Sequence, residues 1–88
     1  MISTLKNIAA LVEDGGEITL GHLDAVGRCV ATATDDAQCL AMLVRRKGES
    51  LDALLRRLDA AIVDAHENEH FADEINVPTP SAPRKPRR

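Results

Sequence analysis

The apolar residues near the N-terminus recur at intervals of three and four, which is the spacing of one helix face. They are Leu5, Ile8, Ala9 and Val12. Ser3 belongs to a residue type that caps helix N-termini, and Gly15-Gly16 is a helix stop. The pattern predicts a helix over residues 3–14.

A longer apolar stripe with the same period lies in the second half of the chain. Its members are Leu51, Leu54, Leu55, Leu58, Ile62 and Ala65. Ser50 precedes the stripe as a cap, and Asp52 complements the helix dipole and is spaced to pair with Arg56. We predict a second helix from residue 51 to about 67.

Residues 25–46, between the helices, favour a β-hairpin. The stretch 28–34 is rich in β-branched residues, Asp35-Asp36 is a turn signal, and residues 39–44 form a short apolar run. A helix beginning at Asp36 competes with this interpretation, and it would make the protein an all-α bundle. Residues 18–26 are too short and mixed to classify, although 20–26 fit a helical turn.

A turn at Asp35-Asp36 sets the register of the hairpin and therefore its two faces. The face toward the helices is expected to hold Cys29, Ala31, Leu40, Met42 and Val44. The outer face is expected to hold Val30, Thr32, Cys39, Ala41 and Leu43, with Arg28 and Arg45 at its margin. That outer face is apolar or neutral, so we expect self-association there, most simply a twofold dimer, or docking of a partner, with Leu43 at the centre of the patch.

The C-terminal segment differs in composition from the rest. Phe71 and Ile75 are spaced to fold back as an anchor, and residues 77–88 hold all four prolines with no apolar period. We therefore predict one α+β domain over residues 1–76, a small α-β-β-α unit with both helices on one face of the hairpin. Residues 77–88 are predicted to be a disordered basic tail.

The net charge of −3 is unevenly distributed. Four basic residues close the chain, Arg84, Lys85, Arg87 and Arg88, whereas residues 1–82 hold 7 basic and 14 acidic side chains. An acidic body repels nucleic acid, so we expect any nucleic-acid binding to be weak, salt-sensitive and dependent on the tail. The chain has one Phe and no Tyr or Trp to stack on single-stranded bases.

The sequence His66-Glu67-Asn68-Glu69-His70 matches H-E-x-x-H, the zinc motif of metallopeptidases. This resemblance would make His66 and His70 ligands and Glu67 a general base. However, the motif falls where the second helix ends, and no third histidine follows it. We expect two solvated histidines with weak adventitious metal affinity and no catalytic metal site.

The cysteine content and the N-terminus bear on the cellular compartment. The first apolar run, residues 8–12, is too short for an export signal or a membrane span, so we expect a cytoplasmic protein with Cys29 and Cys39 as thiols. The predicted register projects these two cysteines from opposite faces of the hairpin, which excludes a bridge between them.

Five of the seven basic residues before the tail fall within thirteen positions, namely Arg45, Arg46, Lys47, Arg56 and Arg57. Arginine suits bidentate contact with carboxylates and phosphates, so these residues are candidates for binding a partner. The competing interpretation is ordinary surface charge balanced by Glu49, Asp52 and Asp59.

No phosphate loop, nucleophile elbow or cofactor motif occurs in the sequence. By general appearance residues 40–76 are similar to small bacterial proteins, a likeness that carries no functional residues with it. We expect a non-catalytic protein that acts by protein–protein binding, as an adaptor or as an inhibitor of the kind mobile elements use against host machinery. A nucleic-acid accessory protein that uses the tail and the Arg45–Arg57 patch is the alternative, and a hydrolase is third. We expect no cofactor and no membrane.

Overall fold

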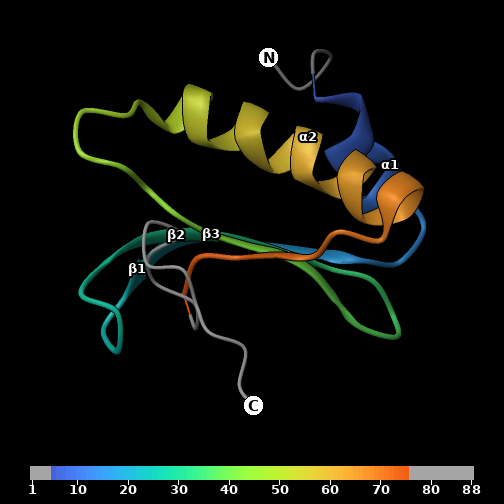
Figure 1. Cartoon of the computed structure of the whole chain (residues 1–88), viewed down its shortest axis with the longest axis horizontal. Coiled ribbons are helices and arrows are strands. Elements are labelled where there is room, and N and C mark those ends of the chain that lie inside the picture. The colour runs from blue at the N-terminus through green and yellow to red at the C-terminus, as the bar shows by residue number, and fades with distance from the viewer. Residues whose placement is uncertain (1–4, 76–88) are drawn as a thin grey trace.

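The computed structural model describes residues 5–75, which form two helices and one mixed four-stranded sheet. The elements are α1 (Lys6–Glu13), β1 (Glu17–Leu23), β2 (Arg28–Thr34), β3 (Cys39–Val44), α2 (Leu51–Asn68) and β4 (Ala72–Asp73). Both helices lie on one side of the sheet (Figure 1). The predicted α+β class and helix placement are confirmed, whereas the α-β-β-α order is wrong because two further strands are present.

The two predicted helices form close to their expected bounds. Ser50 caps α2 as predicted, because its Oγ accepts a hydrogen bond from the backbone N–H of Ala53 at 3.0 Å. The predicted cap of the first helix, Ser3, lies outside the described residues. Leu5 stands at the N-terminus of α1 and has no oxygen in its side chain to cap it.

The N-terminus of α1 is capped instead by a carboxylate of α2. Asp59 Oδ1 accepts hydrogen bonds from the backbone N–H of Asn7 at 2.9 Å and of Ile8 at 2.8 Å. Asp59 Oδ2 accepts a third from the side-chain amide of Asn7 at 2.9 Å. Because a helix N-terminus carries unsatisfied N–H groups and a partial positive charge, this contact both orders α1 and attaches it to α2.

Residues 17–23, which the sequence leaves unclassified, form the edge strand β1. It pairs antiparallel with all seven residues of β2, from Glu17 opposite Thr34 to Leu23 opposite Arg28. The helical turn considered for residues 20–26 is wrong: the strand ends at Leu23, whose carbonyl accepts from Val26 and Gly27 in the connecting turn.

The β2–β3 hairpin forms, so the competing helix from Asp36 is wrong, but so is the predicted register. Asp35 Oδ1 accepts from the N–H groups of Ala37 and Gln38, and Thr34 pairs with Cys39, so the connection has four residues rather than two. A bulge between Ala33 and Thr34 follows, so Ala31 faces Leu43 instead of Leu40.

This odd shift moves the side chains of residues 41–44 to the opposite faces from those predicted, because side chains alternate along a strand. Leu40, at the bulge, is buried in the core as predicted. Leu43 and Ala41 lie in the core, and Leu43 is only 3% exposed. Met42 and Val44 share the other face with Thr32 and Val30, their partners on β2. The predicted dimer surface centred on Leu43 is therefore wrong.

The core lies between the two helices and the sheet. It is made of Leu5, Ile8, Leu11, Ala31, Ala33, Leu40, Ala41, Leu43, Leu54, Leu58, Ile62 and Ala65. The predicted stripe of α2 supplies four of these residues, but its first member, Leu51, is exposed. Small residues in β2 let the helices approach the sheet closely.

Candidate functional site

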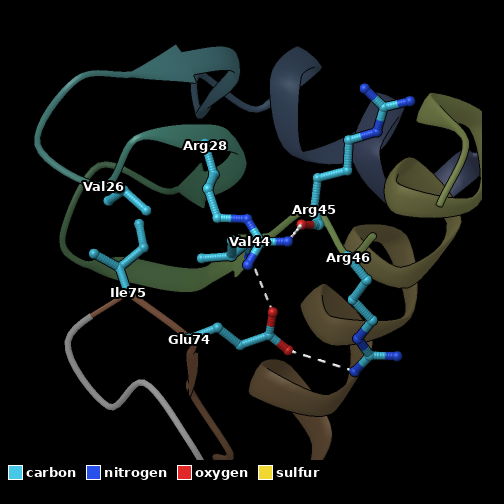
Figure 2. A pocket seen from close by; sticks show the side chains of 7 residues that line it. All are labelled: Val26, Arg28, Val44, Arg45, Arg46, Glu74 and Ile75. Atoms are coloured by element: carbon cyan, nitrogen blue, oxygen red, sulfur yellow. Dashed lines mark hydrogen bonds and ion pairs between the residues drawn. The ribbon is translucent and has the colours of Figure 1, made fainter. Parts of the chain in front are cut away.

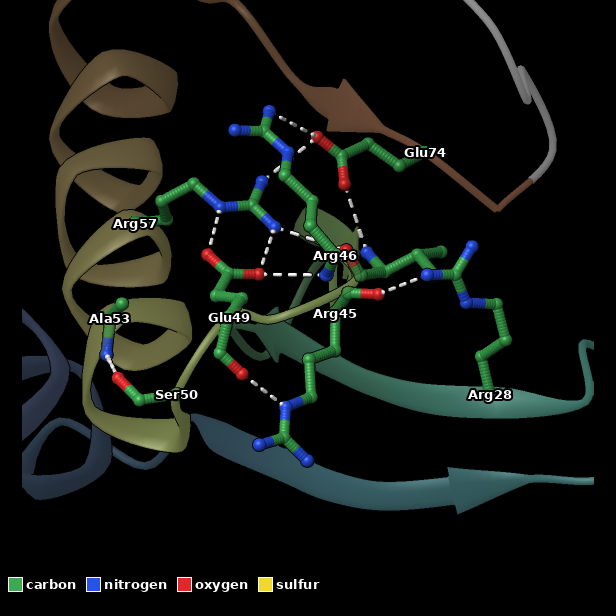
Figure 3. Close-up of polar contacts among 9 residues, drawn as sticks. Arg28, Arg45, Arg46, Glu49, Ser50, Ala53, Arg57 and Glu74 are labelled. Carbon is green, nitrogen blue, oxygen red and sulfur yellow. Dashed lines mark hydrogen bonds and ion pairs between the residues drawn. The ribbon is translucent and has the colours of Figure 1, made fainter.

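Four of the basic residues picked out in the sequence meet a fifth, Arg28, at one end of the sheet. We call the group Arg28, Arg45, Arg46, Lys47 and Arg57 the basic end. Arg28 begins β2, residues 45–47 follow β3, and Arg57 reaches in from α2 (Figure 3). The spacing of residues along the sequence does not identify Arg28 as part of this group, because only the β2–β3 hairpin brings it beside the others.

Arg57 is a structural residue, not a free binding group. Its guanidinium donates to both carboxylate oxygens of Glu49 at 2.8 and 2.9 Å, to Glu74 Oε2 at 3.0 Å and to the carbonyl of Val44 at 3.0 Å. The side chain is 22% exposed, against 10% for Glu49. Four of its five N–H groups are therefore used within the domain, and the binding of a partner by Arg57 stays a prediction.

The Arg57 contact also sets the ionisation of Glu49. Hydrogen bonds from Arg57, together with a 2.9 Å bond from the backbone N–H of Arg46, lower the pKa of Glu49 to about 2 against the opposing effect of burial. Glu49 in turn raises the pKa of Arg57, so both groups are charged at neutral pH.

This ionisation predicts an acid-sensitive fold. Glu49 has a folded pKa of about 2, below its ordinary value of 4.5, so its stabilisation is complete above pH 4.5 and is lost as the pH falls toward 2. We expect Glu49→Gln to make the urea midpoint less dependent on pH across that window. Glu67→Gln, at an exposed position of α2, is the matched control and should leave the pH dependence unchanged. An equal effect of both variants would contradict the assignment to Glu49.

Glu74 fastens the chain after β4 to the sheet. Its backbone N–H donates to the carbonyl of Met42 at 2.7 Å, and its Oε1 accepts from the N–H of Val44 at 2.9 Å. Its Oε2 contacts Arg57 at 3.0 Å and Arg46 at 3.7 Å. The predicted fold-back is thus real, but it rests on Glu74 and β4 and leaves Phe71 exposed.

Two hollows meet at the basic end, and Arg28, Arg45 and Arg46 line both. The first, of about 470 Å³, is also lined by Val26, Val44, Ile75 and Glu74. Val26 and Ile75 lie on one side of it and Arg45 and Arg46 on the other (Figure 2). The second, of about 440 Å³, continues toward Ser50 at the start of α2. The first hollow thus joins cationic groups to an aliphatic border.

Arg28 and Arg45 are held in place by carbonyl groups rather than carboxylates. Arg28 Nη2 donates to the carbonyl of Arg45 at 2.7 Å, and Arg45 Nε donates to the carbonyl of Glu49 at 2.6 Å. Within residues 5–75 neither guanidinium forms an ion pair. Both therefore keep an uncompensated charge and N–H groups that are not used in these bonds.

The remaining predicted contact residues do not line the two hollows. Arg56 pairs with Asp52 on the exposed side of α2, and Lys47 is exposed but lines neither hollow. Val30 faces away from the helices as expected, yet it is 2% exposed and offers no surface, which corrects its assignment as a contact. Arg84, Lys85, Arg87 and Arg88 lie outside the described residues.

The H-E-x-x-H motif does not form a single helical face. α2 ends at Asn68, and Glu69 adopts a left-handed conformation with a φ of 55°. This turns His70 back toward Asp64, with 3.1 Å between Nδ1 and Oδ2. In the described part of the chain no three metal-ligating side chains come together, so His66 and His70 lack a third ligand there.

Cys29 and Cys39 are free and half-buried. They lie toward opposite ends of the hairpin, because Cys39 pairs with Thr34 whereas Cys29 is opposite Arg45, from whose N–H its carbonyl accepts a hydrogen bond. Burial raises the pKa of the Cys39 thiol, which disfavours the reactive thiolate.

Comparison of the chain with protein-family models, with curated proteins and with solved structures gives no match. Among residues 5–75 no helix is long and apolar enough to cross a membrane. The function must therefore be argued from the site itself.

Proposed function

We propose that the protein is a non-catalytic binding domain whose basic end takes up an acidic segment of a partner protein. One observation carries the proposal: the guanidinium groups of Arg28 and Arg45 are fixed by carbonyl oxygens and have no carboxylate partner within residues 5–75. Groups held in this way lose little conformational entropy when they bind an anion.

The charge distribution supports an oriented encounter. The basic end holds five of the seven basic residues before the tail, whereas two of the fourteen acidic residues, Glu49 and Glu74, pair with it. The rest of the body is therefore strongly acidic. An acidic partner is repelled by most of this surface and attracted to one end of it, which favours a single docking orientation.

The lining of the first hollow favours a peptide over a nucleic acid. Val26, Val44 and Ile75 provide an aliphatic border beside the arginines, which fits carboxylates that alternate with aliphatic side chains. The single aromatic residue of the chain, Phe71, is not part of the lining, so the two hollows offer no aromatic ring on which bases could stack.

The test is titration of the protein into a fluorescein-labelled peptide of alternating glutamate and leucine, followed by fluorescence anisotropy. Hydrogen bonds to charged groups contribute roughly 1.5–3 kcal/mol, so Arg28→Gln should weaken binding about tenfold or more. Arg56→Gln removes the same charge from an exposed site outside the hollows and should change the affinity by less than about twofold.

Two further probes separate the alternatives. A glutamate–serine peptide of equal charge should bind more weakly, because it cannot occupy the aliphatic border. A single-stranded oligonucleotide that binds more tightly than either peptide would replace the proposal with the nucleic-acid alternative. An equal loss in Arg28→Gln and Arg56→Gln would show that only net charge matters, and it would overturn the assignment of the site.

A further inference from the structure

β1 is an edge strand of the sheet, paired with β2 and with no other strand of the described residues. Its seven residues pair with β2 without a bulge. Proteins commonly protect such edges with Lys, Pro, bulges or short strands. The sequence Glu-Ile-Thr-Leu-Gly-His-Leu contains neither Lys nor Pro, and its one acidic residue, Glu17, lies at its end. As far as residues 5–75 are concerned, the edge is therefore open to another strand.

The hydrogen-bond pattern of the sheet identifies the groups at this open edge. Arg45 N–H donates to the carbonyl of Cys29 at 2.8 Å, so Cys29 and every second residue after it bond to β3. The intervening residues of β2 form their backbone hydrogen bonds with β1: Val30 with Gly21, Thr32 with Thr19 and Thr34 with Glu17. The backbone N–H and C=O groups of Ile18, Leu20 and His22 consequently point outward from the edge.

The side chains of these three residues lie on the side of the sheet that faces the helices. Ile18 pairs with Ala33, Leu20 with Ala31 and His22 with Cys29. Ile18 packs against the core, whereas Leu20 is 41% exposed. Leu20 thus combines an exposed apolar side chain with outward-pointing backbone groups at the middle of the strand.

We propose that two copies of the chain associate through antiparallel pairing of β1 with β1, about a twofold axis at Leu20. This register is the one that pairs all seven residues of the strand. Leu20 faces Leu20 of the other copy, and Ile18 faces His22, and each such pair exchanges two backbone hydrogen bonds. Glu17 faces the apolar Leu23, so no like charges stand opposite one another.

The occupant is a second copy because the strand is self-complementary in this register. The two sheets become one continuous sheet, and the exposed Leu20 side chains cover each other on the helix side. The interface consists of one strand from each copy, so its buried area is small for a protein–protein interface. The dimer is therefore expected to be weak and concentration-dependent. It is independent of the basic end and of the proposed partner.

The first test is sedimentation velocity of the full chain over a range of concentrations. Wild type should shift from monomer to dimer, and Leu20→Lys should stay monomeric, because two ammonium groups would meet on the twofold axis. Thr19→Lys is the matched control, because it adds the same charge at the neighbouring position. Its side chain lies on the other face of the sheet, opposite Gly21 of the second copy. It should still dimerise, and so should Arg28→Gln.

The second test reads the register directly by amide hydrogen exchange. Amides of Thr19 and Gly21 should be protected at all concentrations, whereas those of Ile18, Leu20 and His22 should gain protection only as the dimer forms. Leu20→Pro removes an N–H that β2 does not use, and it should also abolish the dimer. A wild type that is monomeric throughout, or a Thr19→Lys variant that dissociates as fully as Leu20→Lys, would overturn the proposal.

Discussion

Arg57→Leu is expected to lower the free energy of unfolding by about 3 kcal/mol, which is a large share of the stability of a domain of this size. The substitution leaves Glu49, with a side chain only 10% exposed, and Glu74, at 31%, without their shared cation. Loss of one partner from a fully buried ion pair costs roughly 3–5 kcal/mol, and the partial exposure of Glu74 places this case at the lower end. Urea denaturation followed by circular dichroism measures the change.

The adjacent arginine provides the control. Arg56 forms an exposed i,i+4 pair with Asp52 on the same helix, and such pairs contribute less than about 1 kcal/mol. Arg56→Leu should therefore shift the urea midpoint only slightly. The double variant Arg57→Leu with Glu49→Leu should recover part of the loss, since it also removes the unpaired carboxylate. If the two arginine variants were equally stable, the network around Arg57 would not support the fold.

The contrast between Arg56 and Arg57 shows where sequence reasoning succeeds and where it stops. The pairing of Asp52 with Arg56 follows from their spacing on one helix, as does the capping of α2 by Ser50. The partner of Arg57 is Glu49 before the helix and Glu74 after it, seventeen residues away from Arg57. No local sequence pattern links Arg57 to Glu49 and Glu74. From the sequence alone, the buried network of Arg57 therefore cannot be distinguished from the exposed pair of Arg56.

The sheet shows a similar division. β2 and β3 can be predicted because their residue types favour strands, but β1 is a half-exposed edge strand without clear apolar alternation. The register depends on a four-residue connection and a bulge at Ala33 and Thr34, which the Asp35-Asp36 turn signal does not reveal. That single error moves Leu43 from the core to the surface, and with it the predicted binding face.

The candidate site follows from the corrected sheet. The clustering of Arg45 and Arg46 is visible in the sequence, but the convergence of Arg28 on them requires the hairpin to bring the start of β2 beside the end of β3. Which cations are free also depends on tertiary contacts. Arg57 is neutralised by two carboxylates, whereas Arg28 and Arg45 donate only to carbonyl oxygens within the described part of the chain.

Asp59→Ala is expected to lower the free energy of unfolding by about 2 kcal/mol, although Asp59 is an ordinary polar position of α2 by sequence. The substitution removes the acceptor of two N–H groups of α1, at 2.9 and 2.8 Å, together with a negative charge at a helix N-terminus. α1 has only eight residues, and isolated helices of this length are unstable in water. Amide exchange in α1 should therefore increase more than exchange in β2 and β3, and thermal unfolding should report the overall loss.

Graded variants separate the parts of the Asp59 contact. Asn7→Ala removes only the side-chain bond to Asp59 Oδ2 at 2.9 Å and keeps both capping bonds to Oδ1, so it should lower stability by less than about 1 kcal/mol. Asp59→Asn keeps an oxygen acceptor and loses the charge, and its stability should fall between those of the other two variants. If Asn7→Ala were as damaging as Asp59→Ala, the cap would not be the source of the stability. If Asp59→Ala left exchange in α1 unchanged, packing alone would hold that helix on α2.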